Sequence, residues 1–346
     1  MKKYNQAEIL ASVDRIIPAE AAMEGEYPII DVRSPGEYEG GTIPGAVNVP
    51  IFDEDERSLV GTIYRHQGKD IAINRGFEVV EQKIVDLLET LEPYRKKPLA
   101  VFCARGGMRS RSMVNLLNRS GFSAFQIEGG YKKYRAAVLN VLHELQPGLI
   151  VIHGFTGTGK TRILQYLSPA IDLEGLAGHR SSLFGAIGLN PVNQRTFESG
   201  LARVVSGLGL QPWFIEGESR KIGRVFIPKP LAKAMKEATL VQVHCSIETR
   251  ITQIIDDYQI EDSTTLHQVE KILRSLRQKL GGELVEEMCR LLRENRLRDL
   301  VRILLLEYYD KRYSRSMRDY RYDLELSSEN IEEAAAELQR FRESLL

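Results

Sequence analysis

A cysteine followed by glycines and arginines is the first segment of the chain that could carry out chemistry. The segment Cys103-Ala104-Arg105-Gly106-Gly107-Met108-Arg109-Ser110 follows the apolar run 99–102 and precedes a helical pattern. Backbone N–H groups of such a loop converge above the sulfur, while the helix dipole and the two arginines favour a thiolate. The same groups bind an anion beside that thiolate. The predicted catalytic residues are therefore Cys103, Arg105 and Arg109.

A nucleophilic cysteine inside an anion-binding loop suits two reactions. It could attack a sulfur or selenium donor, which gives a persulfide or a selenylsulfide. It could also attack phosphorus, as cysteine phosphatases do. An inert buried cysteine is the third possibility, and the flanking glycines and arginines argue against it.

A second segment, 154–161, has the pattern G-x-x-x-x-G-K-[ST] between an apolar run and the start of a helix. Its glycines let backbone N–H groups surround phosphate oxygens, the helix N-terminus adds partial positive charge, and Lys160 supplies a full charge. Thr161 could offer its hydroxyl to Mg²⁺, if that ion is bound. The predicted phosphate-binding residues are Gly154, Gly157, Thr158, Gly159, Lys160 and Thr161.

Two acidic residues follow the next predicted strand, 213–215. P-loop proteins that hydrolyse nucleotides usually hold magnesium through an Asp at such a strand end. Glu216 and Glu218 occupy that place here. Position alone favours a role in the site over a pair of solvated carboxylates.

The elements that must position both loops alternate between strands and helices. Apolar runs at 28–32 and 99–102 predict strands, and helical spacing over 78–91 predicts a helix between them. This alternation implies an α/β fold with a mainly parallel sheet. We expect an N-terminal α/β domain over residues 1–140, a linker over 141–148, and a P-loop α/β domain over 149–346. Strands are predicted at 149–153, 213–215 and 240–243, and a largely helical extension is predicted over 247–309.

Composition limits the classes of function. With 346 residues, 43% apolar and 27% charged, the chain fits a soluble protein of two domains. No apolar run is long enough for a membrane span and the first residues lack the apolar core of a signal peptide, so we expect a cytoplasmic protein without a membrane partner. The formal net charge is zero, so RNA contacts must rest on local basic patches. Three scattered cysteines give neither a disulfide framework nor a metal-binding pair.

Three segments of the first half resemble the rhodanese family. They are 31–38, 41–50 and 128–131, although Thr42 stands where these domains usually have His. The cysteine loop has the spacing C-x5-R, which is one residue longer than usual in rhodaneses and matches cysteine phosphatases. A wider loop suits a tetrahedral, phosphate-like anion such as selenophosphate better than thiosulfate.

A rhodanese domain followed by a P-loop domain resembles the tRNA 2-selenouridine synthase family over nearly the whole chain. The segments 56–68, 172–180 and 216–223 add to this resemblance, with Ser181 where a Gly is expected. These last two segments contain the other site candidates, which are Asp172, Glu174, His179, Arg180, Glu216, Glu218 and Arg220.

The resemblance implies a two-step reaction on tRNA that carries 2-thiouridine at the wobble position. A geranyl group from geranyl diphosphate is first placed on the sulfur. Selenophosphate, supplied by selenophosphate synthetase, then displaces the S-geranyl group and leaves 2-selenouridine. The P-loop would hold the diphosphate, and the loop of Cys103 would hold selenophosphate. No tightly bound cofactor is expected.

A segment that interleaves basic and aromatic residues, 308–322, is the candidate RNA contact. Arginines would meet phosphates and tyrosines could stack on unpaired bases. A solvated helix end with packed tyrosines is the alternative. The predicted RNA-binding residues are Lys311, Arg312, Tyr313 and Arg315.

The residues alone leave two other functions open. One is a rhodanese-type sulfurtransferase or cysteine phosphatase fused to a nucleotide-dependent, kinase-like domain, which the C-x5-R spacing supports. The other is a nucleotide-sensing regulatory protein with an inert rhodanese module, and the presence of Cys103 argues against it.

Overall fold

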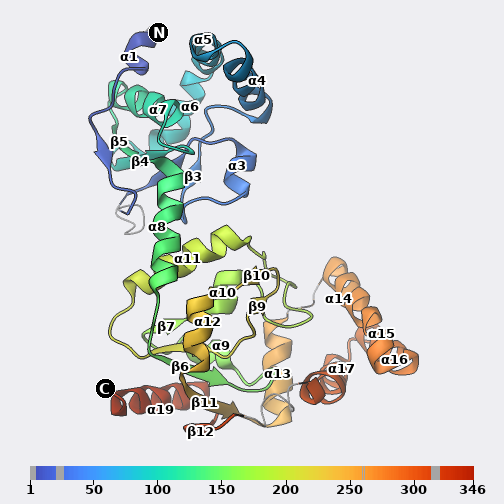
Figure 1. The fold of residues 1–346 in the computed structure, drawn as a ribbon. Helices are drawn as coiled ribbons and strands as arrows, with labels where there is room; N and C mark the ends of the chain where they lie inside the picture. The colour runs from blue at the N-terminus through green and yellow to red at the C-terminus, as the bar shows by residue number, and fades with distance from the viewer. Residues whose placement is uncertain (1–4, 21–26, 259, 261, 313–319) are drawn as a thin grey trace. The chain divides into compact units, whose positions relative to one another are not determined.

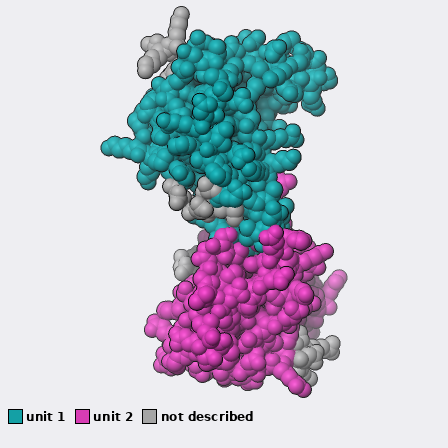
Figure 2. All heavy atoms as spheres, turned by 60° about the vertical axis from the view of Figure 1, so that its left-hand side comes forward, with its two compact units in different colours: residues 1–141, 198–203 teal, residues 142–197, 204–346 magenta. Residues whose placement is uncertain are grey.

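The computed structural model describes residues 5–20, 27–258, 260, 262–312 and 320–346. The chain divides into two compact units, which Figure 2 distinguishes by colour. The N-terminal unit contains residues 1–141 and 198–203, and the C-terminal unit contains residues 142–197 and 204–346.

The N-terminal unit is built on a parallel sheet of five strands in the order β1-β5-β4-β2-β3 (Figure 1). The strands predicted at 28–32 and 99–102 are confirmed as β2 and β4. The strands are β1 (Ile16–Ile17), β2 (Ile29–Asp31), β3 (Val47–Asn48), β4 (Pro98–Phe102) and β5 (Ser123–Ile127). The helices are α1 (Gln6–Ile9), α3 (Pro35–Glu39), α4 (Glu54–His66), α5 (Lys69–Glu81), α6 (Ile84–Leu91), α7 (Met108–Arg119) and α8 (Gly130–Glu144), with a 3₁₀ turn at Glu92–Tyr94.

The single helix predicted over 78–91 is wrong, because α5 ends at Glu81 and α6 begins at Ile84. The break lets α5 pack against α4, with Gly76 lying close to the Phe52 ring. The next segment, α6, then turns its apolar face into the core.

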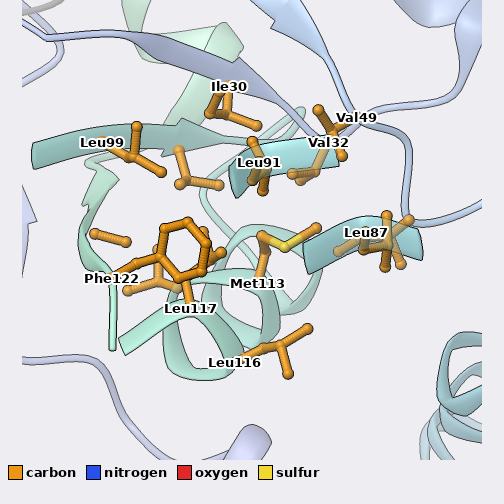
Figure 3. Close-up of a cluster of buried hydrophobic side chains, with 14 of the residues drawn as sticks. Ile30, Val32, Val49, Leu87, Leu91, Leu99, Met113, Leu116, Leu117 and Phe122 are labelled. Atoms are coloured by element: carbon orange, nitrogen blue, oxygen red, sulfur yellow. The ribbon is translucent and has the colours of Figure 1, made fainter. Parts of the chain in front are cut away.

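Buried apolar side chains from the strands and the helices of this unit form its core (Figure 3). Strands β2 and β4 pack there against α6 and α7, so the core fixes β4 and α7 on either side of the Cys103 loop. The labelled members are Ile30, Val32, Val49, Leu87, Leu91, Leu99, Met113, Leu116, Leu117 and Phe122.

The C-terminal unit has a second parallel sheet of five strands, in the order β12-β11-β6-β8-β7. The strands predicted at 149–153, 213–215 and 240–243 are confirmed. They belong to the set β6 (Leu149–His153), β7 (Ala170–Ile171), β8 (Trp213–Glu216), β11 (Thr239–His244) and β12 (Leu324–Ser327), and an antiparallel pair is formed by β9 (Lys221–Ile222) and β10 (Val225–Phe226). The helices around this sheet are α9 (Lys160–Leu164), α10 (Leu173–Ala177), α11 (Gln194–Gly207), α12 (Lys229–Lys236) and α19 (Ile331–Ser344).

The predicted helical extension is confirmed and has its own apolar core. It includes a π-helical segment after α17, which residues 310–312 continue as α-helix. The extension consists of α13 (Ile247–Asp257), α14 (Ser263–Ser275), α15 (Arg277–Leu280), α16 (Gly282–Arg293), α17 (Leu297–Ile303) and the π-helix Leu304–Tyr309.

The segment expected to link the domains, 141–148, is partly helical. Residues 141–144 form the last turn of α8, and residues 145–148 lead irregularly into β6. No proline or glycine lies between Gly130 and Pro147, so α8 continues into the segment and ends at Glu144, shortly before Pro147. Among the described residues, no helix is both long and apolar enough to cross a bilayer.

Gly130→Ala tests how tightly the start of α8 packs on the cysteine loop. Gly130 has φ +58°, and a Cβ atom there would lie 2.2 Å from the Cys103 carbonyl oxygen. We expect a loss of about 2–4 kcal/mol in the stability of the N-terminal unit, measured by hydrogen exchange of the β4 and β5 amides.

The matched control is Gly61→Ala, because a Cβ at Gly61 meets nothing within 4 Å and the residue lies inside α4. Fluorescence of Trp213, the single tryptophan, reports on the C-terminal unit and should keep its wild-type unfolding transition in both variants. Wild-type exchange rates in Gly130→Ala would contradict the prediction.

Candidate functional site

Cys103 lies directly after β4, at the carboxyl end of the parallel sheet, and its loop leads into α7. The side chain is only 3% exposed. The backbone N–H of Gly107 donates to the sulfur at 3.2 Å, and the Ser110 hydroxyl oxygen lies 3.2 Å from the sulfur. These contacts hold the sulfur at the start of α7, where the geometry suits a nucleophile or a leaving group.

The backbone of this loop is held from outside by β5 and α8. The side-chain amide of Gln126 donates to the Gly106 carbonyl at 2.9 Å and to the Ser110 hydroxyl at 2.8 Å. The N–H of Tyr131 donates to the Cys103 carbonyl at 2.9 Å. With these carbonyls engaged elsewhere, the loop is fixed for binding an anion through its N–H groups.

The two predicted arginines have different surroundings. Arg105 is exposed, whereas Arg109 forms a two-pronged pair with Glu37 of α3, with N–O distances of 2.6 and 3.2 Å. Burial alone would raise the pKa of Glu37 and lower that of Arg109, but their mutual pairing outweighs burial and shifts both pKa values the opposite way. Glu37 thus fixes the guanidinium of Arg109 and partly compensates its charge.

The second loop joins the central strand β6 to α9, as the G-x-x-x-x-G-K-[ST] pattern predicts. Gly157 has φ +83°, and a Cβ there would lie 2.8 Å from the Ile254 side chain and 3.0 Å from the Arg250 carbonyl oxygen, so the loop can approach α13 only with glycine. The Lys160 ammonium donates to the Gly154 carbonyl at 3.1 Å. Thr158 is 1% exposed and its hydroxyl donates to the Phe155 carbonyl at 2.9 Å, so that side chain braces the loop from inside.

Arg250 of α13 supports the same loop and was missed by the sequence reasoning. Its Nε donates to the Thr156 carbonyl at 2.9 Å, and its two terminal nitrogens pair with Asp310 at 2.7 and 3.0 Å. No local pattern marks it, because both partners lie far away in the sequence.

A cavity of about 340 Å³ opens beside this loop. Asp172, His179, Glu216 and Arg220 are not part of its wall. His153 and Tyr258 are wall residues that the sequence analysis did not select, and Tyr320 belongs to the segment 308–322 that it selected as the candidate RNA contact. The predicted residues that line it are Gly154, Gly157, Gly159, Lys160, Thr161, Glu174, Arg180 and Glu218.

Three of the predicted residues that lie outside the cavity wall contact other parts of the C-terminal unit or solvent. Asp172 caps α10 by accepting from the N–H of Gly175 at 2.7 Å, and burial raises the pKa of Asp172. His179 packs against Gly223, and burial lowers its pKa. Arg220 is exposed and borders a neighbouring cavity.

Carboxyl groups near Lys160 have raised pKa values. Burial, with the neighbouring negative charges, raises the pKa of Glu216 well above its usual range and that of Glu218 to about 7. Burial also raises the pKa of Glu174, which accepts from the Thr161 hydroxyl at 3.2 Å. Glu216 is 1% exposed and accepts from the N–H of Glu174 at 2.6 Å. Glu218 is a wall residue and is only partly ionised near neutral pH, so the wall carries less negative charge than its composition suggests, which favours an anionic ligand.

A histidine and an arginine complete the polar wall. Burial and the charge of Lys160 lower the pKa of His153 to about 4, so this ring is neutral at ordinary pH. It meets the Tyr320 ring edge-on, with centroids 4.7 Å apart. Arg180 donates to the Ile187 and Asp257 carbonyls at 3.0 and 2.8 Å.

The described residues give little support to the expected metal site and the expected RNA contact. Among the described residues, no group of three or more His, Cys, Asp or Glu side chains is arranged to hold a metal ion. Lys311 pairs with Glu307 at 2.5 Å, and Arg312 donates to the Tyr308 hydroxyl at 3.3 Å. Tyr313 and Arg315 lie outside the described residues.

Glu218→Gln tests the electrostatics of the cavity. Inorganic diphosphate should bind more weakly as the pH rises through about 7, because Glu218, whose pKa is raised to about 7, then becomes negative. One added charge near the ligand is worth on the order of 1 kcal/mol, or about fivefold in affinity. Calorimetric titrations between roughly pH 6 and 8 should therefore show a shallower loss of affinity in Glu218→Gln than in wild type.

The ligand's own protonation affects every variant equally, so only the difference between slopes counts. Glu283→Gln, at an exposed position in α16, should keep the wild-type slope. Equal slopes in wild type and Glu218→Gln would show that Glu218 does not titrate in the cavity.

Comparison with known proteins places both units in one family. The family model described as "tRNA 2-selenouridine synthase AAA domain" matches residues 147–344, and the model described as "Rhodanese-like domain" matches residues 19–137. A tRNA 2-selenouridine synthase from Pseudomonas syringae pv. syringae is 33% identical over 304 residues, which cover 82% of this chain and 81% of the relative. One from Nitrosomonas europaea is 35% identical over 265 residues, covering 72% and 68%. The chain therefore belongs to the tRNA 2-selenouridine synthase family.

Proposed function

We propose that this protein converts 2-thiouridine at the wobble position of tRNA to 2-selenouridine. The observation that carries the proposal is the pairing, in one chain, of an anion-binding loop around a buried cysteine with a P-loop cavity. The family matches span both units in that order. The relatives that match most of the chain bear the name of this activity.

The first step is S-geranylation in the P-loop cavity. The sulfur of 2-thiouridine attacks C1 of geranyl diphosphate, so that an S–C bond forms while the C–O bond breaks, diphosphate leaves, and the N3 proton of the base passes to solvent. Lys160 and the loop N–H groups stabilise the departing charge. Alkylation converts the sulfur into a good leaving group.

We expect Mg²⁺ to accompany the diphosphate in this cavity. The Thr161 hydroxyl and the Glu174 carboxylate lie 3.2 Å apart at the cavity wall, and oxygen ligands of this kind suit the ion. When bound, the ion would supply positive charge next to the diphosphate.

The second step is selenation at the cysteine loop. The selenium of selenophosphate attacks C2 of the base, a C–Se bond forms, and geranyl thiolate leaves. The Cys103 thiolate then attacks phosphorus, so that an S–P bond forms while the Se–P bond breaks and 2-selenouridine is released. Water hydrolyses the phosphocysteine to free thiol and phosphate. Arg105, Arg109 and the loop N–H groups hold the phosphoryl group, in keeping with the C-x5-R spacing.

The tRNA backbone is expected to contact Lys311 and Arg312, which are exposed at the end of the helical extension. Replacing both with Ala should lower the slope of log affinity against log salt by about 2 for unmodified tRNA. Fluorescence titrations at several salt concentrations would measure it. The control replaces Lys96 and Lys97, which are exposed on the N-terminal unit. A wild-type slope in the Lys311/Arg312 variant would remove these residues from the RNA contact.

Nucleoside mass spectrometry tests the two steps separately. Wild-type protein with 2-thiouridine tRNA and geranyl diphosphate should form S-geranyl-2-thiouridine, and added selenophosphate should convert it to 2-selenouridine. Cys103→Ala should geranylate the base, accumulate the base whose selenium still carries the phosphoryl group, and lose 2-selenouridine formation by about 10²-fold or more. Lys160→Ala should lose geranylation by about 10²-fold. Cys245→Ala is the matched cysteine control and should perform both steps.

Full selenation by Cys103→Ala would overturn the role of that residue. Unchanged 2-thiouridine under every condition, with a folded protein, would overturn the proposed function. The C-x5-R spacing would then favour a sulfurtransferase or phosphatase, and turnover of thiosulfate or phosphate esters would decide between these two.

A further inference from the structure

An apolar cavity of about 70 Å³ lies in the helical extension of the C-terminal unit. Its wall is formed by α13, α14, α17, the π-helix 304–309 and the segment 182–187. Protein interiors contain few voids larger than a water molecule, so an open apolar cavity between packed helices points to a ligand. Representative wall residues are Phe184, Ile187, Val269, Leu300, Val301 and Leu304.

This cavity adjoins the phosphate cavity. Thr156, Ser182, Ile254 and Tyr258 line both. Ile254 lies directly against the phosphate loop, since a Cβ atom on Gly157 would come within 2.8 Å of its Cδ1 atom. A ligand with its phosphates on the loop can therefore extend past Ile254 into the apolar cavity.

The wall chemistry favours a hydrocarbon over a nucleobase. Its polar side-chain groups are the hydroxyls of Thr156, Ser182, Tyr258 and Tyr309, and those of Ser182 and Tyr258 already lie 2.9 Å from each other. A base buried there would leave ring nitrogens and exocyclic groups without partners, which is unfavourable. A hydrocarbon chain has no such groups and loses water-exposed apolar surface on entry.

The cavity volume limits the length of the chain. An apolar cavity of roughly 150 Å³ accommodates benzene, so the volume of about 70 Å³ suits the branched end of a chain rather than a ring system. The carbons nearer the phosphates would lie along Ile254 and Tyr258. A π-helical segment forms part of the wall, and such segments are frequent at functional sites.

We propose that the apolar cavity binds the terminal isoprene unit of a short prenyl diphosphate whose phosphates occupy the P-loop cavity. Under the proposed function, on which this inference rests, that ligand is geranyl diphosphate. The helical extension therefore selects the chain length of the substrate, and the P-loop binds the head group common to all of them.

Binding of four ligands to the full chain tests this assignment by calorimetry. They are inorganic diphosphate and the dimethylallyl, geranyl and farnesyl diphosphates. Wild type should bind the geranyl compound about tenfold more tightly than the dimethylallyl one, because a further isoprene unit is buried. The farnesyl compound should bind more weakly than the geranyl one, because its third unit exceeds the cavity.

Two variants should move this preference in opposite directions. Val301→Phe fills the cavity and should lower geranyl affinity about tenfold, to the dimethylallyl level. Leu304→Ala enlarges the cavity and should raise farnesyl affinity relative to geranyl. Neither change should alter the affinity for inorganic diphosphate. The control is Val80→Phe, which fills a separate apolar cavity in the N-terminal unit and should leave all four affinities unchanged.

The assignment would be overturned if each variant changed the affinities for all chain lengths by the same factor. It would also be overturned if the wild type bound the three prenyl diphosphates with equal affinity. If Val301→Phe also loses inorganic diphosphate through misfolding, the farnesyl-to-geranyl ratio of Leu304→Ala decides. The tRNA assay separates the two proposals. Chain-length selectivity without formation of S-geranyl-2-thiouridine would refute only the proposed function, whereas geranylated tRNA with selectivity unaffected by both variants would refute only the cavity assignment.

Discussion

Both units depend on backbone N–H groups that must stay free at the carboxyl end of a parallel strand. An anion is bound well only if these donors are fixed in place before it arrives, because ordering them afterwards would consume the binding energy. Each loop therefore follows a strand flanked on both sides, β4 in the first sheet and β6 in the second. Side chains from other elements, Gln126 in one unit and Arg250 in the other, take up the loop carbonyls.

The local charge differs between the two loops. Arg109 is paired with Glu37, which partly offsets the charge of its guanidinium. Lys160 stands among carboxyl groups whose pKa values are raised by burial, so these groups offset less of its charge than their number suggests. A site that binds an anion too strongly would release its product slowly, and a site without cations would not bind it.

Local sequence patterns predicted the strands β2, β4, β6, β8 and β11, the two loops and the helical nature of 247–309, because each depends on a few neighbouring residues. They did not predict the break between α5 and α6, which depends on packing against α4. They also missed Glu37 as the partner of Arg109 and Arg250 as a support of the P-loop, because those contacts join distant segments. Glu216 was expected at a strand end and lies there, but only the structure shows that its carboxyl is buried against the N–H of Glu174. Gln126, a polar residue within the apolar run of β5, was an available signal for the support of the cysteine loop. The catalytic roles assigned from sequence stay predictions.

The π-helix 304–309 couples two properties that would otherwise evolve separately. A π-helical turn contains one residue more than an α-helical turn. Losing that residue would rotate everything after it by about 100°, which would turn Asp310 away from Arg250 and at the same time reshape the wall at Leu304. A single deletion would thus alter both the apolar cavity and the support of the phosphate loop. The length of this segment is therefore constrained by the phosphate loop that Asp310 and Arg250 hold, whereas its side chains at the cavity wall can change without moving that support.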